Sequence, residues 1–319
     1  MRVQVPPRAP KKSLDCNVSE TFCFFPEWLA TKNVLKMYRQ RGILLLKYVR
    51  MEGKIMKILV IHGSTRKGNT YSLTKEIVNR LAAKPSVECT EINVADLELP
   101  FCRSCHACFD KGEEYCPHYE IMRGIESALK DCDGVILSGT TYMWALNAAM
   151  KNLLDHMSYG FHRPALFGKK GMVVTTSKGA GEKGVAKYLR TVLGQWGVNG
   201  SIIVTMNAKE KQLKTKGSKY LDSVVDRYYQ LIASGKAVSP SIKNIAVHNS
   251  FRAMSLSEFG ESECDAKHWQ QPGFFDRAYP VKAGPFKYAA GSIVHGLVKR
   301  STKIIGKIYA KRLTENNPE

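Results

Sequence analysis

The stretch that decides the fold reads KILVIH over Lys57–His62, and GSTRKGNT follows it directly over Gly63–Thr70. An unbroken apolar run rich in branched residues is typical of a strand that is buried on both faces of a parallel sheet. The polar stretch leads into a predicted helix over Thr70–Ala83, in which apolar residues recur at helical spacing. A strand, a polar loop and a helix in this order predict the first unit of an α/β fold.

The same alternation continues along the chain to about residue 235. Further strands are predicted at Val87–Val94, Asp133–Gly139, Gly171–Thr176 and Gly200–Thr205, and further helices at Tyr119–Lys130, Leu146–Met157, Val185–Trp196 and Ser218–Ala233. Five strands that alternate with helices predict a doubly wound, five-stranded parallel sheet with helices on both faces. Ligands bind such sheets beyond the carboxyl ends of the strands.

The loop after the first predicted strand suits a terminal phosphate. A helix N-terminus offers unpaired N–H groups and the positive end of the helix dipole. Neither a Gly-x-Gly-x-x-Gly pattern nor a Walker Lys-Ser/Thr pair is present, which argues against a dinucleotide fingerprint and an NTPase loop. A simple helix cap after a glycine turn is the alternative interpretation. The candidate phosphate ligands are short polar residues and one fixed cation: Ser64, Thr65, Arg66, Asn69 and Thr70.

Two more loops at strand ends complete the predicted pocket. The third strand is followed by Thr140, Thr141, Tyr142, Met143 and Trp144, and the fourth by Ser177, Gly179 and Gly181. The apolar side chains are suited to form a wall against an aromatic ring, although such a cluster also occurs in ordinary cores. Glycine permits close approach of the backbone to a ligand. The three loops together predict phosphate at the first loop and a planar ring between the other two.

Four cysteines form a Cys-x2-Cys-x2-Cys-x7-Cys run after the second predicted strand. They are Cys102, Cys105, Cys108 and Cys116. A set of thiolates alone suits an iron–sulfur cluster or zinc, and redox-active or structural thiols are the alternatives. His62, His106 and His118 lie near the predicted pocket in the sequence, and we interpret them as structural or surface residues. Nine cysteines, four of them clustered, favour a reducing, cytoplasmic compartment.

The two ends of the chain are basic and differ in composition from the middle. Residues 1–55 hold 11 Lys/Arg against 4 Asp/Glu, within a net charge of +20 for the whole chain. We interpret this part as a solvated extension, or as residues upstream of a native start at Met51 or Met56. Residues 236–319 are expected to form a partly helical extension. Its predicted helix over Pro285–Leu313 carries an apolar stripe, which we expect to pack on the body of the protein or on a partner subunit; contact with an anionic membrane surface is the less favoured alternative. No motif of nucleic-acid readers is present, so no nucleic-acid partner is expected.

Taken together, these motifs resemble the NADPH-dependent FMN reductase branch of the flavodoxin-like superfamily and, within it, the iron–sulfur flavoproteins. The resemblance covers about Met56–Lys209, with the domain itself expected over 56–235. It implies that the three loops contact FMN, that NAD(P)H is a possible co-substrate, and that the cysteine loop 102–116 holds a [4Fe-4S] cluster. It also implies a homo-oligomer, either a dimer or a tetramer. Two positions depart from the family pattern: Thr140 replaces a common proline, and His156 replaces a common arginine.

The favoured function is therefore an FMN-dependent oxidoreductase that moves electrons between a reduced donor and an acceptor. The donor is NAD(P)H or a ferredoxin-like protein, and no protein acid or base is expected because FMN carries the chemistry. A cluster-free NAD(P)H-dependent flavin or quinone reductase is the first alternative. A non-catalytic FMN electron carrier is the second.

Overall fold

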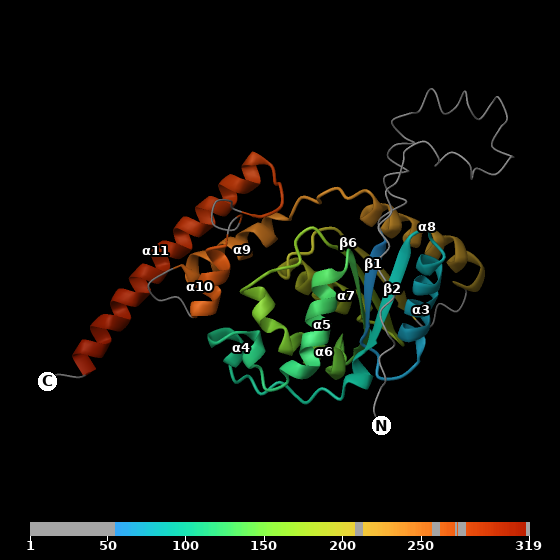
Figure 1. Cartoon of the computed structure of the whole chain (residues 1–319), viewed down its shortest axis with the longest axis horizontal. Helices are drawn as coiled ribbons and strands as arrows, with labels where there is room; N and C mark the ends of the chain where they lie inside the picture. The colour runs from blue at the N-terminus through green and yellow to red at the C-terminus, as the bar shows by residue number, and fades with distance from the viewer. Residues whose placement is uncertain (1–54, 208–212, 257–261, 272, 274–278, 317–319) are drawn as a thin grey trace, which may run out of the picture. The chain divides into compact units, whose positions relative to one another are not determined.

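A computed structural model describes residues 55–207, 213–256, 262–271, 273 and 279–316 (Figure 1). The expected extension over 1–55 lies outside these residues except for its last position. The described helices include none that is long and apolar enough to cross a membrane.

The predicted doubly wound parallel sheet is confirmed. Its strand order is β2-β1-β3-β5-β6, and every neighbouring pair on this path is parallel. A two-residue strand that the sequence did not reveal, β4 (Ala145–Leu146), pairs antiparallel with β3. This is the flavodoxin-like order, whose topological switch point lies between β1 and β3. The strands of the path are β1 (Met56–His62), β2 (Val87–Asn93), β3 (Gly134–Tyr142), β5 (Lys170–Ser177) and β6 (Ser201–Asn207).

The register brings three strand ends to one edge of the sheet. His62 of β1 pairs with Ser138 of β3, and Thr140 of β3 pairs with Thr176 of β5. The loops that follow β1, β3 and β5 therefore start side by side, as the sequence predicted for the three candidate ligand loops.

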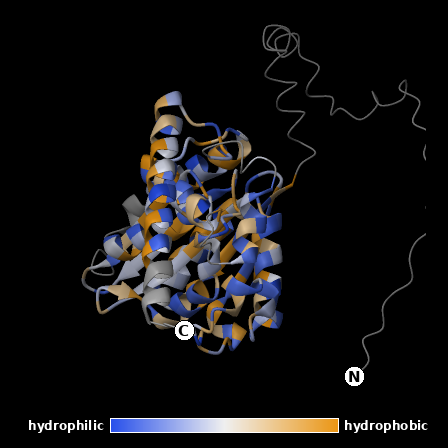
Figure 2. Ribbon diagram, turned by 90° about the vertical axis from the view of Figure 1, so that its left-hand side faces the viewer, coloured by the Kyte–Doolittle hydropathy of each residue, from blue (hydrophilic) through white to orange (hydrophobic). Residues whose placement is uncertain are grey.

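Each face of the sheet carries its own layer of helices, and alternate strand residues point to each layer. Leu59 and Ile61 of β1 pack toward α5, α6 and α7, whereas Ile58 and Val60 pack toward α3 and α8. Apolar and polar residues alternate along the helices that Figure 2 shows, as expected of helices that cover a sheet with one side. The bounds are α3 (Asn69–Ala82), α8 (Leu213–Ala233), α5 (Tyr119–Asp131), α6 (Ala148–His156) and α7 (Glu182–Gln195).

Beyond the sheet, the described residues of the C-terminal part form three helices, whereas the sequence predicted one. They are α9 (Ile242–Ser255), α10 (Glu263–Trp269) and α11 (Pro285–Asn316). The first two begin at serine N-caps: Ser241 accepts a hydrogen bond from the Asn244 N–H, and Ser262 accepts one from the Asp265 N–H. Helix α11 packs along α9, and the rings of Tyr279 and Phe167 join this part to the loop before β5.

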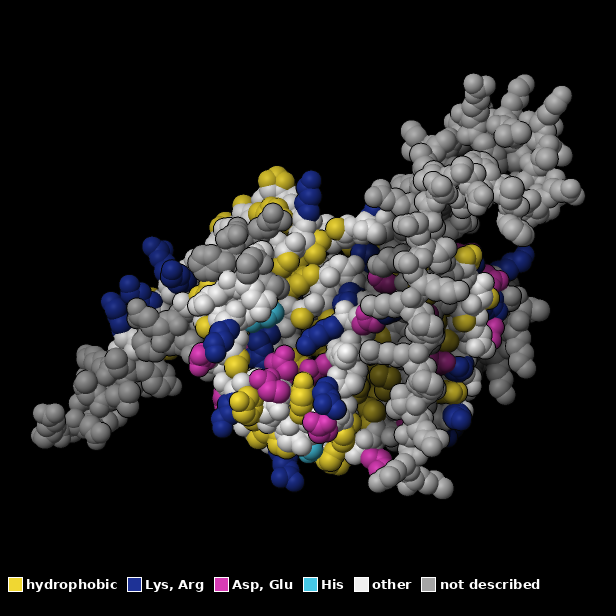
Figure 3. All heavy atoms as spheres, viewed as in Figure 1, with side chains coloured by type: hydrophobic (Ala, Val, Ile, Leu, Met, Phe, Trp, Pro, Cys, Tyr) yellow, Lys and Arg dark blue, Asp and Glu magenta, His cyan; other side chains and the backbone are white. Residues whose placement is uncertain are grey.

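The orientation of α11 corrects one expectation. The apolar stripe that was expected to pack on the body of the protein is exposed, whereas Gly291 and Gly306 of the same helix are buried. Lysine and arginine side chains are prominent around this helix in Figure 3. Packing of the stripe on a partner subunit stays a prediction. The exposed stripe residues are Phe286, Ile293, Leu297, Ile304 and Ile308.

The burial of His248 makes the stability of the chain depend on pH. The ring lies against Trp269 and Tyr279, neither ring nitrogen has a hydrogen-bond partner among the described residues, and burial lowers its pKa to about 3. Because the unfolded histidine has a pKa of about 6.5, the unfolded chain binds a proton between these pH values that the folded chain does not. Stability is therefore lost as the pH falls below about 6.5.

We expect His248→Phe, which keeps an aromatic ring and removes the titration, to reduce this loss by up to about 3 kcal/mol between pH 7 and pH 4.5. Urea unfolding of both proteins at the two pH values measures the difference. An equal acid sensitivity in wild type and variant would contradict the assignment.

Candidate functional site

The three candidate ligand loops are joined by the hydroxyl of Thr70. This residue lies in the first turn of α3 and is 1% exposed. Its Oγ1 lies 2.9 Å from Thr140 Oγ1, at the end of β3, and 2.6 Å from Thr176 Oγ1, at the end of β5. Thr70 and Thr140 were predicted to contact a ligand, and in the structure their hydroxyls connect the loops to one another.

Asn147, directly before α6, makes a second connection between the same loops. Its Nδ2 donates to the Gly63 carbonyl at 2.5 Å, and its Oδ1 accepts from the Thr140 N–H at 3.2 Å. The chain passes so close here that a Cβ atom on Gly63 would lie 2.4 Å from the Ser138 carbonyl oxygen. Gly63 is therefore required for close packing of the first loop against β3.

The first loop keeps the features of an anion site. The N-terminus of α3 has no side-chain cap, and no acidic residue lies in its first turn. The side chains of Thr65, Arg66 and Asn69 are exposed beside it. Ser64 is largely buried, and its hydroxyl donates to the Arg66 carbonyl at 2.7 Å. Backbone N–H groups and Arg66 are thus the groups best placed to hold a phosphate.

The second loop exposes two large apolar side chains and contains a buried hydroxyl without a partner among the described residues. Met143 and Trp144 adopt left-handed backbone conformations, with φ of 45° and 63°, and are 94% and 76% exposed. Such strain in bulky residues is typical of functional sites. Thr141 Oγ1 is buried and has no hydrogen-bond partner within the described part of the chain. These residues fit a planar heteroaromatic ring that stacks on the exposed side chains and bonds to Thr141.

The third loop closes against the second. Gly181 has a φ of 97°, and a Cβ atom there would lie 3.3 Å from Trp144 Cα and 3.0 Å from Thr141 Cγ2. Gly179 is exposed and its carbonyl accepts a hydrogen bond from Asn207. Ser177 is buried and donates to Glu182 at 2.6 Å, so its hydroxyl is engaged within the protein.

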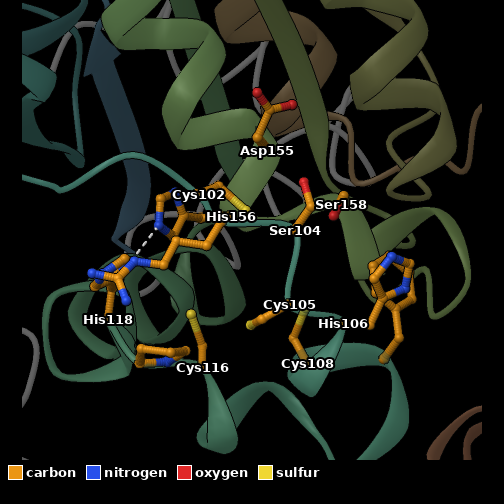
Figure 4. A pocket seen from close by; sticks show the side chains of 13 residues that line it. Cys102, Ser104, Cys105, His106, Cys108, Cys116, His118, Asp155, His156 and Ser158 are labelled. Atoms are coloured by element: carbon orange, nitrogen blue, oxygen red, sulfur yellow. Dashed lines mark hydrogen bonds between the residues drawn. The ribbon is translucent and has the colours of Figure 1, made fainter.

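The four clustered cysteines line one cavity of about 330 Å³ (Figure 4). All four are free thiols, and Figure 4 shows their side chains arranged around a common space below α6. Ser104 and His106 have φ of 51° and 61°, and these left-handed conformations turn the chain between Cys102 and Cys108. The opposite wall includes Asp155 and His156 of α6.

Asn152 of α6 holds the start of the cysteine loop. Its Oδ1 accepts from the Cys102 N–H at 3.0 Å, and its Nδ2 donates to the carbonyls of Leu99 and Pro100 at 3.1 Å and 3.0 Å. The sequence reasoning missed this residue, because an asparagine within a helix gives no sign of a partner about 50 positions away.

Arg163 holds the other side of the same loop. It is buried, donates to the carbonyls of Cys108 and Phe109, and forms ion pairs with Glu113 and with Asp265 of α10. Asp265 is 1% exposed, and His162 also bonds to it at 2.8 Å. The positive charge of Arg163 and the hydrogen bond from His162 counter burial and lower the pKa of Asp265. The C-terminal part thus supports the cysteine loop through a buried ion pair.

Two histidines lie beside the thiols. His156, 3% exposed, directs Nδ1 at the Asn152 carbonyl at 2.8 Å, so that Nδ1 carries the proton and Nε2 the lone pair. His118 Nδ1 lies 2.8 Å from that Nε2 and donates to it (Figure 4). Of the other two histidines considered from the sequence, His106 lines the same cavity, whereas His62 is buried against Glu91 outside it.

In the absence of a bound cation, the cavity favours the uncharged forms of its residues. Burial raises the pKa of Cys108 to about 11 and raises the pKa of Cys116, and burial also lowers the pKa of His118. A positively charged metal centre would reverse this preference, because a coordinated thiol loses its proton.

Comparison with known proteins identifies the family of the segment that contains the ligand loops and the cysteine loop. Residues 56–208 match the family model of the NADPH-dependent FMN reductases. An iron-sulfur flavoprotein of Archaeoglobus fulgidus is 25% identical over 230 residues, which is 69% of this chain and 100% of the relative. An iron-sulfur flavoprotein of Methanocaldococcus jannaschii is 36% identical over 101 residues, 31% of this chain and 51% of the relative. An NADPH azoreductase of a Bacillus species is 28% identical over 138 residues, 41% of this chain and 70% of the relative.

Among solved structures, an NADH:FMN oxidoreductase in its apo form matches 54% of this chain and 88% of its own, with 19% identity and a TM-score of 0.41.

From the hydrogen bonds of Asn152 we predict that substitution of this residue changes the reactivity of the cysteine thiols. Asn152→Ala removes three hydrogen bonds to the segment 99–102, so we expect the cysteine loop to open more often and its thiols to react several-fold faster with an alkylating reagent. The rate of thiol alkylation in the reduced, metal-free protein measures this.

Asn199→Ala is the matched control, because Asn199 is a buried carboxamide that bonds to Gly197 and Tyr279 and does not touch the loop. If both variants change the alkylation rate equally, Asn152 has no specific role in holding the loop.

Proposed function

The segment 56–208 belongs to the NADPH-dependent FMN reductase family, and from this premise we propose that the chain is an iron–sulfur flavoprotein. It is an FMN-dependent NAD(P)H oxidoreductase in which the flavin exchanges electrons with a [4Fe-4S] cluster on Cys102, Cys105, Cys108 and Cys116. The acceptor is a small molecule or a protein.

One observation carries the proposal: a single helix supports both sites. Asn147, directly before α6, bonds to two of the ligand loops, and His156, the last residue of α6, lines the cysteine cavity. With a rise of about 1.5 Å per residue, these two positions lie about 14 Å apart along the helix axis. A rigid helix of this length supports a short path between the two centres.

The residues of the ligand loops would bind and orient the cofactor. FMN, when bound, supplies the redox chemistry by accepting electrons in pairs or singly. Arg66 and the N–H groups at the start of α3 would hold its phosphate, while Met143 and Trp144 would pack on the ring. Thr141 Oγ1 would donate to a ring heteroatom. The roles predicted for Ser64, Thr65, Asn69, Thr70, Thr140, Tyr142, Ser177, Gly179 and Gly181 remain part of this proposal.

The cysteine loop would hold the cluster with four ligands from one segment. Thiolates are the usual ligands of such clusters, and hydrogen bonding and solvent exposure around the sulfurs set their potential. Asn152 and Arg163 would position the loop through its backbone, at Cys102 and Cys108. Two relatives named as iron-sulfur flavoproteins support the same assignment.

A second candidate function is a cluster-free reductase. The similarity to an NADPH azoreductase over 138 residues favours it. In this case, the protein would oxidise NAD(P)H and reduce a quinone or azo compound through FMN alone. The remaining alternative, an electron carrier, would bind FMN without steady-state turnover.

We also propose that the protein acts as a homo-oligomer, a dimer or a tetramer, in a reducing compartment such as the cytoplasm. Exposed Tyr142, Met143 and Trp144, together with the apolar stripe of α11, support an interface with a second copy. Sedimentation analysis of the full chain measures the number of chains in the oligomer.

Anaerobic purification distinguishes the candidate functions. We expect about one FMN, four irons and four sulfides per chain, and NAD(P)H oxidation that depends on FMN. The matched variants Cys105→Ser and Cys89→Ser should differ: the first loses iron and keeps FMN, whereas the second, in a strand remote from the cavity, keeps both. If the wild type contains FMN but no iron, the cluster assignment is wrong and the cluster-free reductase becomes the favoured function. The absence of FMN binding would contradict the proposal as a whole.

The unpaired hydroxyl of Thr141 gives a separate prediction for FMN binding. Thr141→Val keeps the shape of the side chain and removes the donor, so FMN should bind about 10-fold more weakly. Fluorescence quenching of FMN on titration with the apoprotein measures the dissociation constant. Thr191→Val is the control, since Thr191 lies in α7 and its hydroxyl donates to the Lys187 carbonyl one turn earlier. This variant should bind FMN as the wild type does. If all three proteins bind FMN with equal affinity, Thr141 does not contribute to FMN binding.

A further inference from the structure

Within the cysteine cavity, three donors of mixed type already lie close together. Cys116 Sγ and one ring nitrogen each of His118 and His156 all lie within 4.8 Å of one another. We propose that they form a binding site for a single zinc-type divalent ion, distinct in its ligands from the four-thiol set. The site shares only Cys116 with the proposed cluster and does not depend on FMN.

The orientation of His156 supports this assignment. Metal-binding histidines usually donate their second ring N–H to a carbonyl or carboxylate, which fixes the tautomer and directs the other nitrogen at the metal. His156 Nδ1 makes this contact with the Asn152 carbonyl at 2.8 Å, and the ring is 3% exposed. The Nε2 lone pair is therefore held toward His118 before any ion arrives.

The distances require only a small adjustment. Zinc lies about 2.0–2.1 Å from nitrogen and about 2.3 Å from sulfur, so tetrahedral ligand atoms are about 3.3–3.6 Å apart. The two ring nitrogens are 2.8 Å apart and would separate slightly, whereas the sulfur would move inward from at most 4.8 Å. Rotation of the half-buried side chains of Cys116 and His118 is sufficient for this change.

The proton balance is simple. His118 donates through Nδ1 in the metal-free protein, so it must move this proton to Nε2 before Nδ1 can bind the ion. The Cys116 thiol releases its proton to solvent as the S–metal bond forms. One proton is thus released for each ion bound, and no oxidant or reductant is required.

The donor set selects the class of metal. Two imidazoles and one thiolate are typical zinc ligands, whereas Mg²⁺ and Ca²⁺ require oxygen. Three protein ligands leave the fourth position of the ion for water. Because Cys116 cannot complete both sets at once, zinc and the cluster exclude each other.

The test uses the full chain, reduced and freed of metal by a chelator, with zinc chloride as the probe and a chromophoric chelator as competitor. The wild type should bind one zinc per chain, and His118→Ala should bind it at least about 10-fold more weakly. His106→Ala is the matched control, because His106 lines the same cavity but is not among the three donors. Cys105→Ser is the second control, and both controls should bind zinc within about threefold of the wild type.

Three results would overturn the inference: wild type that binds no zinc, His118→Ala that binds it as tightly as the wild type, or Cys105→Ser that weakens binding as much as His118→Ala. The last result would indicate a site made of the four thiols. FMN content and iron content of each protein are measured on anaerobically purified samples before the chelator is added. His118→Ala should keep four irons and FMN, so failure of the zinc site and failure of the proposed function give different results.

Discussion

The candidate site depends on one constraint: three polar side chains at and along α6 are buried and must find partners. Asn147, Asn152 and His156 are 4%, 8% and 3% exposed. Buried polar groups are almost always hydrogen-bonded, because an unpaired one costs about 1–3 kcal/mol. Their partners are the backbone of the first and second ligand loops, the backbone at Cys102, and His118. A helix fixed on the sheet by Met150, Leu153 and Leu154 thereby positions two chemically different sites.

Two further networks extend this arrangement. On the side of the ligand loops, the hydroxyl of Thr70 joins the first turn of α3 to the ends of β3 and β5. On the other side, Arg163 connects the cysteine loop to Asp265, so that a helix of the C-terminal part stabilises a loop about 150 residues earlier. Removing one partner of such a buried ion pair is strongly destabilising, because it leaves the other charge unpaired. The C-terminal helices are thus part of the support of the cavity.

Much of the fold could be predicted from the sequence, because apolar periodicity marks buried strands and helices locally. The five long strands and the helices between them were identified in this way, and the cysteine spacing placed four thiols in one loop. The rest depends on contacts between distant residues. Helix α9 was missed because polar His248 and Asn249 lie on its buried side, which obscures the amphipathic pattern. Asn152 and Arg163 were missed because their partners are set by tertiary packing. His156 was noted only as a departure from the family pattern, for the same reason. The sequence of α11 did not indicate whether its apolar stripe faces the protein or the solvent.

The central claim is that the ligand loops and the cysteine cavity form one redox unit supported by α6. Rapid mixing of the anaerobic protein with NADPH, followed by optical and electron paramagnetic resonance detection, tests this claim most directly. The account predicts that loss of the flavin absorbance is accompanied by the signal of a reduced cluster within a single turnover. A flavin that is fully reduced while the iron centre stays oxidised would contradict it.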